Sequence, residues 1–151
     1  MHYGYVDGEN SRVEARCKNQ EAGLRVYMVK HNFKNLKVWQ RSMDLTDLIF
    51  DYIKDLPDNE KYNLINQLNR CSCSIPSNIA EGSGKRTNTH FAEFLSTALT
   101  STFELETQLL ICERRKYGDQ TKLNNCLELA SEMQKMLFSF RDYIINDKVI
   151  S

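Results

Sequence analysis

The chain has 151 residues, which is enough for one domain with a substantial core. Its 20 basic residues balance its 20 acidic residues, so net charge provides no bulk attraction to nucleic acid or to a membrane. The 2 prolines and 6 glycines favour long helices over a turn-rich β fold, and no apolar run approaches the roughly 18 residues that span a bilayer.

Residues 1–32 show no clean apolar period, and we expect them to form a poorly ordered extension. The alternative is a short helix around residues 13–26 that lies on the folded domain. Met28 begins the run that leads into the patterned region, so translation starts at Met1 or at Met28. Residues 33–146 are the predicted domain, and 147–151 are a C-terminal tail.

A first helix is predicted over about residues 36–56, because apolar side chains recur there at helical spacing. The recurring positions are Val38, Leu45, Ile49, Tyr52 and Leu56. Pro57 should end this helix, since the residue before a proline avoids the α region. Asp58 is then the expected N-cap of the next helix.

The second helix is predicted over about residues 59–81. Its apolar positions are Leu64, Leu68, Cys71, Ile75, Asn78 or Ile79, and Gly82. Gly82 and Gly84 stand where a helix commonly ends in a left-handed residue, so we expect them to supply that conformation.

The third helix should begin at Thr87 or Asn88, either of which can cap it. Its core series is Phe91, Leu95, Ala98, Thr102, Leu105, Leu109 and Cys112, and Phe94, Leu99, Phe103 and Leu110 widen that stripe. This helix is therefore expected to bury two faces, and Gly118 should end it.

The fourth helix is predicted from about residues 119–121 to 145, with the core series Leu123, Leu127, Ala130, Met133, Leu137, Phe140 and Ile144. Four helices joined by short loops predict an all-α, antiparallel up-down-up-down four-helix bundle. The apolar surplus on the third helix exceeds what one core requires. Together with the small residues Ser74, Ala80, Ala92 and Ser96, it predicts a self-association face.

The cysteines and histidines indicate no catalytic chemistry. Of the 5 cysteines (Cys17, Cys71, Cys73, Cys112 and Cys126), four lie in apolar helical patterns, which predicts reduced, buried thiols in a cytoplasmic protein. The 3 histidines form no metal pattern, and no phosphate-binding loop or paired Glu-x-x-His motif occurs. We therefore expect a protein that is not an enzyme and uses no metal or cofactor.

Pro76 lies inside the second helix, where it removes the backbone donor for the carbonyl of Ser72. Asn78 and Glu81 follow it by less than two turns. One interpretation is a functional polar pair at a subunit junction or a nucleic-acid surface. The favoured interpretation is structural: a polar side chain satisfies the freed carbonyl, and Glu81 pairs with a neighbouring arginine.

Basic residues gather at one end of the predicted bundle, where the first helix begins, the second loops into the third, and the fourth ends. They are Lys34, Lys37, Arg41, Lys85, Arg86, Arg141 and Lys148. This group predicts a phosphate-contacting surface for RNA or DNA. The alternative is a solvated rim, because nearby acidic residues dilute it. A second basic run, residues 114–116, is better explained by the dipole at a helix C-terminus.

Three stretches resemble a known family. They are residues 33–40, which include Trp39; residues 74–82, which include Pro76, Asn78, Glu81 and Gly82; and residues 91–109, which include Glu104 and Glu106. They resemble the bacterial four-helix-bundle proteins encoded within intervening sequences of 23S ribosomal RNA genes. The accessory variability determinant of diversity-generating retroelements belongs to the same group.

This resemblance, over roughly residues 33–145, implies a left-twisted bundle that assembles into a homopentameric ring. It also implies a link to RNA or DNA, which is direct in the retroelement branch, where the accessory protein works with a reverse transcriptase. The leading expectation is an oligomeric accessory protein for ribosomal RNA or another nucleic acid. The alternative is a protein-interaction scaffold that docks a polymerase, such as a reverse transcriptase, or a ribosomal component.

Overall fold

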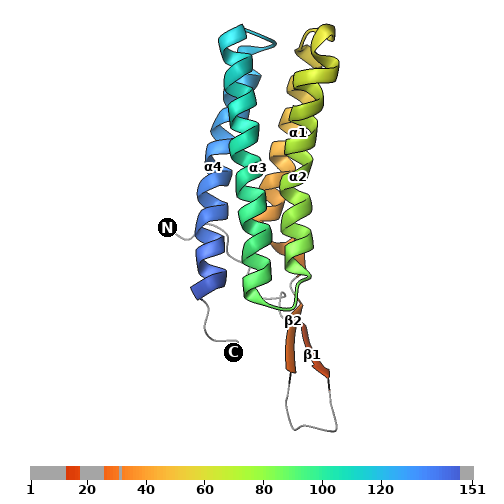
Figure 1. The fold of residues 1–151 in the computed structure, drawn as a ribbon, viewed down its shortest axis with the longest axis vertical. Coiled ribbons are helices and arrows are strands. Elements are labelled where there is room, and N and C mark those ends of the chain that lie inside the picture. Colours follow the sequence, from red (N-terminus) through yellow and green to blue (C-terminus); the bar gives the residue numbers. More distant parts are fainter. Residues whose placement is uncertain (1–12, 18–25, 31, 147–151) are drawn as a thin grey trace.

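The computed structural model describes residues 13–17, 26–30 and 32–146, and four long helices dominate it (Figure 1). They are α1 (Lys37–Tyr52), α2 (Asn66–Ser83), α3 (Asn88–Arg115) and α4 (Gln120–Asn146). Figure 1 shows consecutive helices running alternately up and down, which is compatible with the expected topology. Helices α1 and α3 each pack against both α2 and α4, so the predicted four-helix bundle is confirmed.

The core follows the predicted helical periods. Every position of the series from Phe91 to Cys112 is buried, as are all five positions predicted for the first helix. In α2 the core position belongs to Ile79, while Asn78 is only partly buried. One prediction is wrong: Cys73 is an exposed free thiol, because it lies on the solvent side of α2. Cys71, Cys112 and Cys126 are buried free thiols, as predicted.

The connection from α1 to α2 has its own short helical segments. After α1, a 3₁₀ turn covers Ile53–Asp55, and Leu56 then takes the extended ψ of 153° that a following proline imposes. A second 3₁₀ turn (Asp58–Glu60) and a π-helical segment (Lys61–Ile65) lead into α2. The predicted stop before Pro57 is therefore confirmed.

The expected N-cap at Asp58 is wrong. Pro57 precedes the 3₁₀ turn, and no side chain caps it. The backbone N–H of Glu60 instead donates to the Pro57 carbonyl over 3.0 Å, so a main-chain oxygen takes the place expected for the carboxylate. The predicted cap of the third helix is confirmed, because the Thr87 hydroxyl accepts from the His90 N–H at 3.2 Å.

The two glycines after α2 do not have the left-handed conformation expected of them. Gly84 has φ −87°, and among the described residues positive φ occurs at Lys116 (56°) and Gly118 (66°). Gly82 is required for packing instead. A Cβ added there would lie 2.6 Å from Phe94 Cβ and 2.8 Å from Phe91 Cδ2, closer than side chains approach. The glycine lets α2 and α3 meet tightly beside their connecting loop.

Two strands precede the bundle. β1 (Val13–Cys17) and β2 (Val26–Lys30) pair antiparallel, with Val13 opposite Lys30. The helix considered for residues 13–26 is therefore wrong, and these two segments have regular structure where a poorly ordered extension was expected. Valine and tyrosine in the second segment favour a strand over a helix, which explains the difference. The rest of residues 1–31, and the tail 147–151, lie outside the described residues.

Candidate nucleic-acid interface

The predicted basic surface draws on two segments that meet at one end of the bundle. Lys34 lies in a 3₁₀ turn (Phe33–Asn35), and Lys37 is the first residue of α1. Lys85 and Arg86 lie in the loop between α2 and α3. Figure 1 places the start of α1 and this loop at the same end. We call these four residues the basic end.

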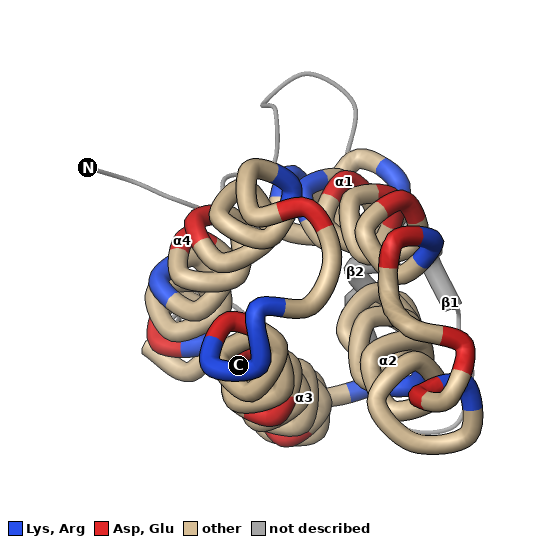
Figure 2. The backbone as a smooth tube through the Cα atoms, turned by 90° about the horizontal axis from the view of Figure 1, so that it is seen from above, with Lys and Arg blue, Asp and Glu red and all other residues tan. Residues whose placement is uncertain are grey.

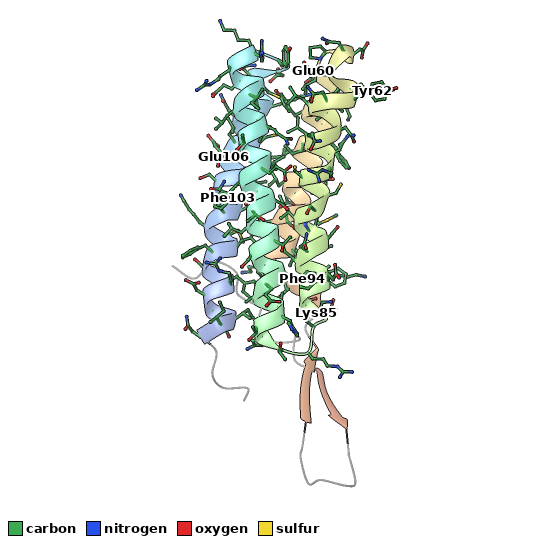
Figure 3. The ribbon with its side chains drawn as sticks, viewed as in Figure 1. Glu60, Tyr62, Lys85, Phe94, Phe103 and Glu106 are labelled. Carbon is green, nitrogen blue, oxygen red and sulfur yellow. The ribbon has the colours of Figure 1, made fainter. Side chains whose placement is uncertain are left out.

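The four side chains of the basic end differ in how many contacts they make with other residues of the chain. Lys85 Nζ lies 4.6 Å from the centre of the Phe94 ring and 3.7 Å from a Glu81 carboxylate oxygen (Figure 3). Its charge is therefore partly compensated. Lys34 and Arg86 are exposed, and neither forms an ion pair within the described part of the chain. These two cations are therefore accessible to a phosphate.

Arg41 belongs to another surface. Its guanidinium binds Glu132 on α4 through two hydrogen bonds of 3.2 and 2.8 Å, and it also binds Asp44 at 3.0 Å. The hydrogen bonds to Glu132 are the main cause that raises the pKa of Arg41. These groups line a groove of about 470 Å³ with the carboxylates of Asp47 and Glu128. Arg41 thus lies in an acidic groove between α1 and α4, and it adds little to the basic end.

The two remaining predicted cations also add little. The Arg141 guanidinium lies 4.9 Å from the centre of the Phe138 ring, and it contacts Ser96 at 3.5 Å and Asp142 at 3.7 Å. Lys148 lies outside the described residues.

At the opposite end of the bundle, Figure 2 shows Lys and Arg interspersed with Asp and Glu on all four helices.

Pro76 is buried in α2, and a neighbouring helix compensates for its missing N–H. The Thr46 hydroxyl of α1 lies 3.1 Å from the Ser72 carbonyl oxygen and 2.9 Å from that of Ser42. One hydroxyl proton is shared between these two acceptors. The carbonyl freed by Pro76 is therefore satisfied by a side chain, as the structural interpretation expected, but the donor is Thr46, which sequence reasoning did not identify. The sequence feature that could have pointed to this donor is a threonine next to the apolar positions of the first helix.

Asn78 links α2 to α3 indirectly. Its amide donates to the Ser74 carbonyl at 2.8 Å and lies 3.0 Å from the Ser74 hydroxyl. That hydroxyl is 2.9 Å from the hydroxyl of Ser101 on α3.

The predicted pairing of Glu81 with an arginine is wrong, because within the described residues its ion pair is with Lys85, one turn further along the chain, at 3.7 Å.

The other motif residues also join elements of the bundle. Glu104 accepts from Arg70 of α2 at 2.8 Å, and Glu106 accepts from Gln134 of α4 at 2.6 Å. The two carboxylates therefore serve different helix pairs, because residues two apart lie on different faces of a helix. Trp39 packs edge-to-face on Phe33, with ring centres 5.1 Å apart.

Replacing Thr46 with valine should destabilise the fold by about 1–2 kcal/mol, because the buried Ser72 carbonyl loses its donor. In a Pro76→Ala background the cost should be smaller, since the new N–H at position 76 can donate to that carbonyl. Urea unfolding of the four proteins measures the difference. Thr97→Val, at an exposed position of α3, is the control. Equal costs in both backgrounds would contradict this account of the proline.

Within the described residues, no helix combines the length and apolarity needed to cross a membrane. In the same residues, no three His, Cys, Asp or Glu side chains are grouped to hold a metal ion.

These observations define a four-helix-bundle protein whose motif side chains join neighbouring helices and whose basic end carries two exposed cations, Lys34 and Arg86. The family model described as 23S rRNA-intervening sequence protein matches residues 34–139, and the chain belongs to this family, as its motifs predicted. The comparison with curated proteins gave no match.

A solved structure from Bacteroides thetaiotaomicron, described as a protein with unknown function from the S23 ribosomal protein family, is 25% identical to this chain. The match has a TM-score of 0.64 and covers 69% of this chain and 97% of that one.

Proposed function

We propose that this protein is a non-catalytic, self-associating accessory protein that contacts RNA or DNA through its basic end. The observation that carries the proposal is the meeting of Lys34 and Lys37 with Lys85 and Arg86 at one end of the bundle. Of these cations, Lys34 and Arg86 are exposed and form no ion pair within the described residues, so they can bind phosphate by releasing counterions. The family description refers to 23S rRNA, which makes RNA the first ligand to test.

Self-association explains how a chain of zero net charge could present a strong positive field. Copies arranged around an axis, with five expected from the family resemblance, would bring several basic ends side by side. Exposed apolar side chains support such contacts: Phe103 is 48% exposed and Phe138 is 52% exposed in the single chain. The proposed setting is the cytoplasm.

The test is binding of the purified protein to a structured RNA and to duplex DNA over a series of salt concentrations. The double variant Lys34→Glu/Arg86→Glu should bind at least about tenfold more weakly, and its salt slope should be shallower by about 1.8, since each lost phosphate contact contributes about 0.9. Arg114→Glu/Arg115→Glu makes the same charge change at the other end and should bind normally. No binding at low salt, or equal losses in both variants, would contradict the proposal.

A second candidate function is a scaffold or accessory subunit that docks a polymerase such as a reverse transcriptase. The exposed aromatic side chains of α3 and α4 favour it, because such residues anchor protein interfaces. This candidate is supported if the protein binds no nucleic acid at low salt but forms a stable complex with a purified reverse transcriptase.

A further inference from the structure

The paired strands β1 and β2 lie outside residues 34–139, the part of the chain that the family model matches. Figure 1 shows the two strands projecting beyond the end of the bundle at which α2 connects to α3. Their sheet has two strands, so within the described residues each strand is paired along one edge only. A two-stranded sheet is marginally stable in water, and an unpaired edge is a template for a further strand.

The register of the two strands sorts their residues into two faces. Residues that stand opposite each other in an antiparallel pair share a face, and the face alternates along each strand. One face takes five apolar residues and one lysine: Val13, Ala15, Cys17, Val26, Met28 and Lys30. The other face takes Glu14, Arg16, Tyr27 and Val29. The pair of strands is therefore amphipathic, as expected for part of a larger sheet.

The sequence of β1 is complementary to itself when the strand pairs antiparallel about its central residue, Ala15. In that register Ala15 stands opposite Ala15 of a second copy, and Val13 stands opposite Cys17. Glu14 stands opposite Arg16, and two-fold symmetry gives this pair twice. Opposite charges across two strands stabilise a sheet, and like charges directly opposite destabilise it.

Other pairings lack this match. A shift of β1 by one residue takes Glu14 away from Arg16, and a shift by two residues places Glu14 opposite Glu14 or Arg16 opposite Arg16. Antiparallel pairing of β2 about Met28 places Lys30 opposite Val26, with no pair of opposite charges. Charge complementarity therefore favours one edge, that of β1, and one register.

We propose that β1 of one copy pairs antiparallel with β1 of a second copy, centred on Ala15, to give a four-stranded sheet in the order β2–β1–β1–β2. Five apolar residues from each copy then share one face, which meets the requirement of three or more strands with an apolar face. The added strand contributes main-chain hydrogen bonds, and the opposed residues set the register. The contact lies outside the bundle and depends neither on contacts between bundles nor on the proposed binding of RNA or DNA.

The connection to the bundle allows this pairing. Lys30 is the end of β2 that leads into the bundle, and it stands opposite Val13, so the bundle follows the Val13 end of β1. Antiparallel pairing places the Val13 end of one copy beside the Cys17 end of the other. The two bundles consequently lie at opposite ends of the sheet and do not compete for space.

The first test reverses one charge at a time in the full chain and follows association by sedimentation velocity over a micromolar concentration series. Glu14→Arg places arginine opposite arginine, and Arg16→Glu places glutamate opposite glutamate, so each should weaken association at least about tenfold. An equimolar mixture of the two variants restores both pairs of opposite charge and should associate as wild type does. Lys30→Glu is the control, because position 30 stands opposite Val13 of its own copy.

The second test is a cross-link, made in a Cys17→Ser/Cys73→Ser background to remove the native thiol of β1 and the exposed thiol of α2. Ala15→Cys should form an intermolecular disulfide under mild oxidation, because opposed residues of antiparallel strands have Cα atoms about 4.5–5.5 Å apart. Met28→Cys, at the centre of β2, should not, since β2 is the outer strand of the proposed sheet. Non-reducing electrophoresis distinguishes the two.

The outcomes separate this proposal from self-association through the bundles. A wild-type protein that stays monomeric throughout the series overturns it. An oligomer whose mass neither charge variant changes also overturns it, and leaves contacts between bundles standing. A mixture that fails to recover association, or a cross-link at Met28→Cys in place of Ala15→Cys, shows that the register or the edge is wrong. Circular-dichroism melting of the charge variants should match wild type, since positions 14 and 16 lie outside the four helices.

Discussion

Ile79→Asp should leave the protein largely unfolded or insoluble at 25 °C. Ile79 is fully buried in α2, so the substitution removes an apolar side chain worth about 1.5–3 kcal/mol. It also places a carboxylate among apolar neighbours without a partner, which brings the expected total above about 4–5 kcal/mol. Domains of this size are stable by about 5–15 kcal/mol, so little or no margin remains.

Far-UV circular dichroism and urea unfolding measure this effect. Ser77→Asp introduces the same charge at an exposed position of the same helix and should be tolerated. Ile79→Val should cost only about 0.5–1.5 kcal/mol. A soluble Ile79→Asp protein with the melting temperature and mass of wild type would show that this part of α2 is not packed as described.

Gly82→Ala and Gly84→Ala should change stability in opposite directions. At position 82 the new methyl group meets Phe94 Cβ at 2.6 Å, so α2 and α3 must separate, at a cost of about 1–3 kcal/mol. At position 84 the methyl group meets only the Glu81 carbonyl at 3.5 Å, and φ is −87°. That substitution should stabilise the protein by about 0.4–1 kcal/mol, because it restricts the unfolded chain.

Chemical denaturation of the two glycine variants measures the change in the free energy of unfolding for each, one expected to fall and the other to rise. Replacing glycine with alanine restricts the unfolded chain by a similar amount at both positions, so most of the difference between the variants reports the contact between α2 and α3. If Gly82→Ala were as stable as Gly84→Ala, the close approach beside this loop would be wrong.

The helices were predictable because their apolar periods are long and unbroken. The series from Phe91 to Cys112 covers six turns, and every member is buried. Local chemistry fixed several ends as well: Pro57 forces Leu56 into extended backbone, and Thr87 caps α3 with its own hydroxyl. These signals act within a few residues, so a single sequence contains them.

Interactions between distant segments were the part that the sequence left open. The donor for the Ser72 carbonyl is Thr46, 26 residues earlier, and nothing local to Pro76 identifies it. The role of Gly82 depends on two aromatic side chains of α3, so a turn glycine was the natural but incorrect expectation. Likewise, Arg41 shares the predicted end of the bundle, but Glu132 of α4 draws it into an acidic groove.

The bond from Thr46 to the Ser72 carbonyl restricts how the bundle can rearrange. Apolar side chains tolerate a slide of one helix past another, because successive turns offer similar neighbours. The freed carbonyl occurs at one place only, and a one-turn slide of about 5.4 Å would carry it away from its hydroxyl. That displacement would cost about 1–3 kcal/mol for the stranded oxygen alone. A rearrangement that tilts or rotates α1 and α2 as a pair keeps this hydrogen bond and avoids that cost.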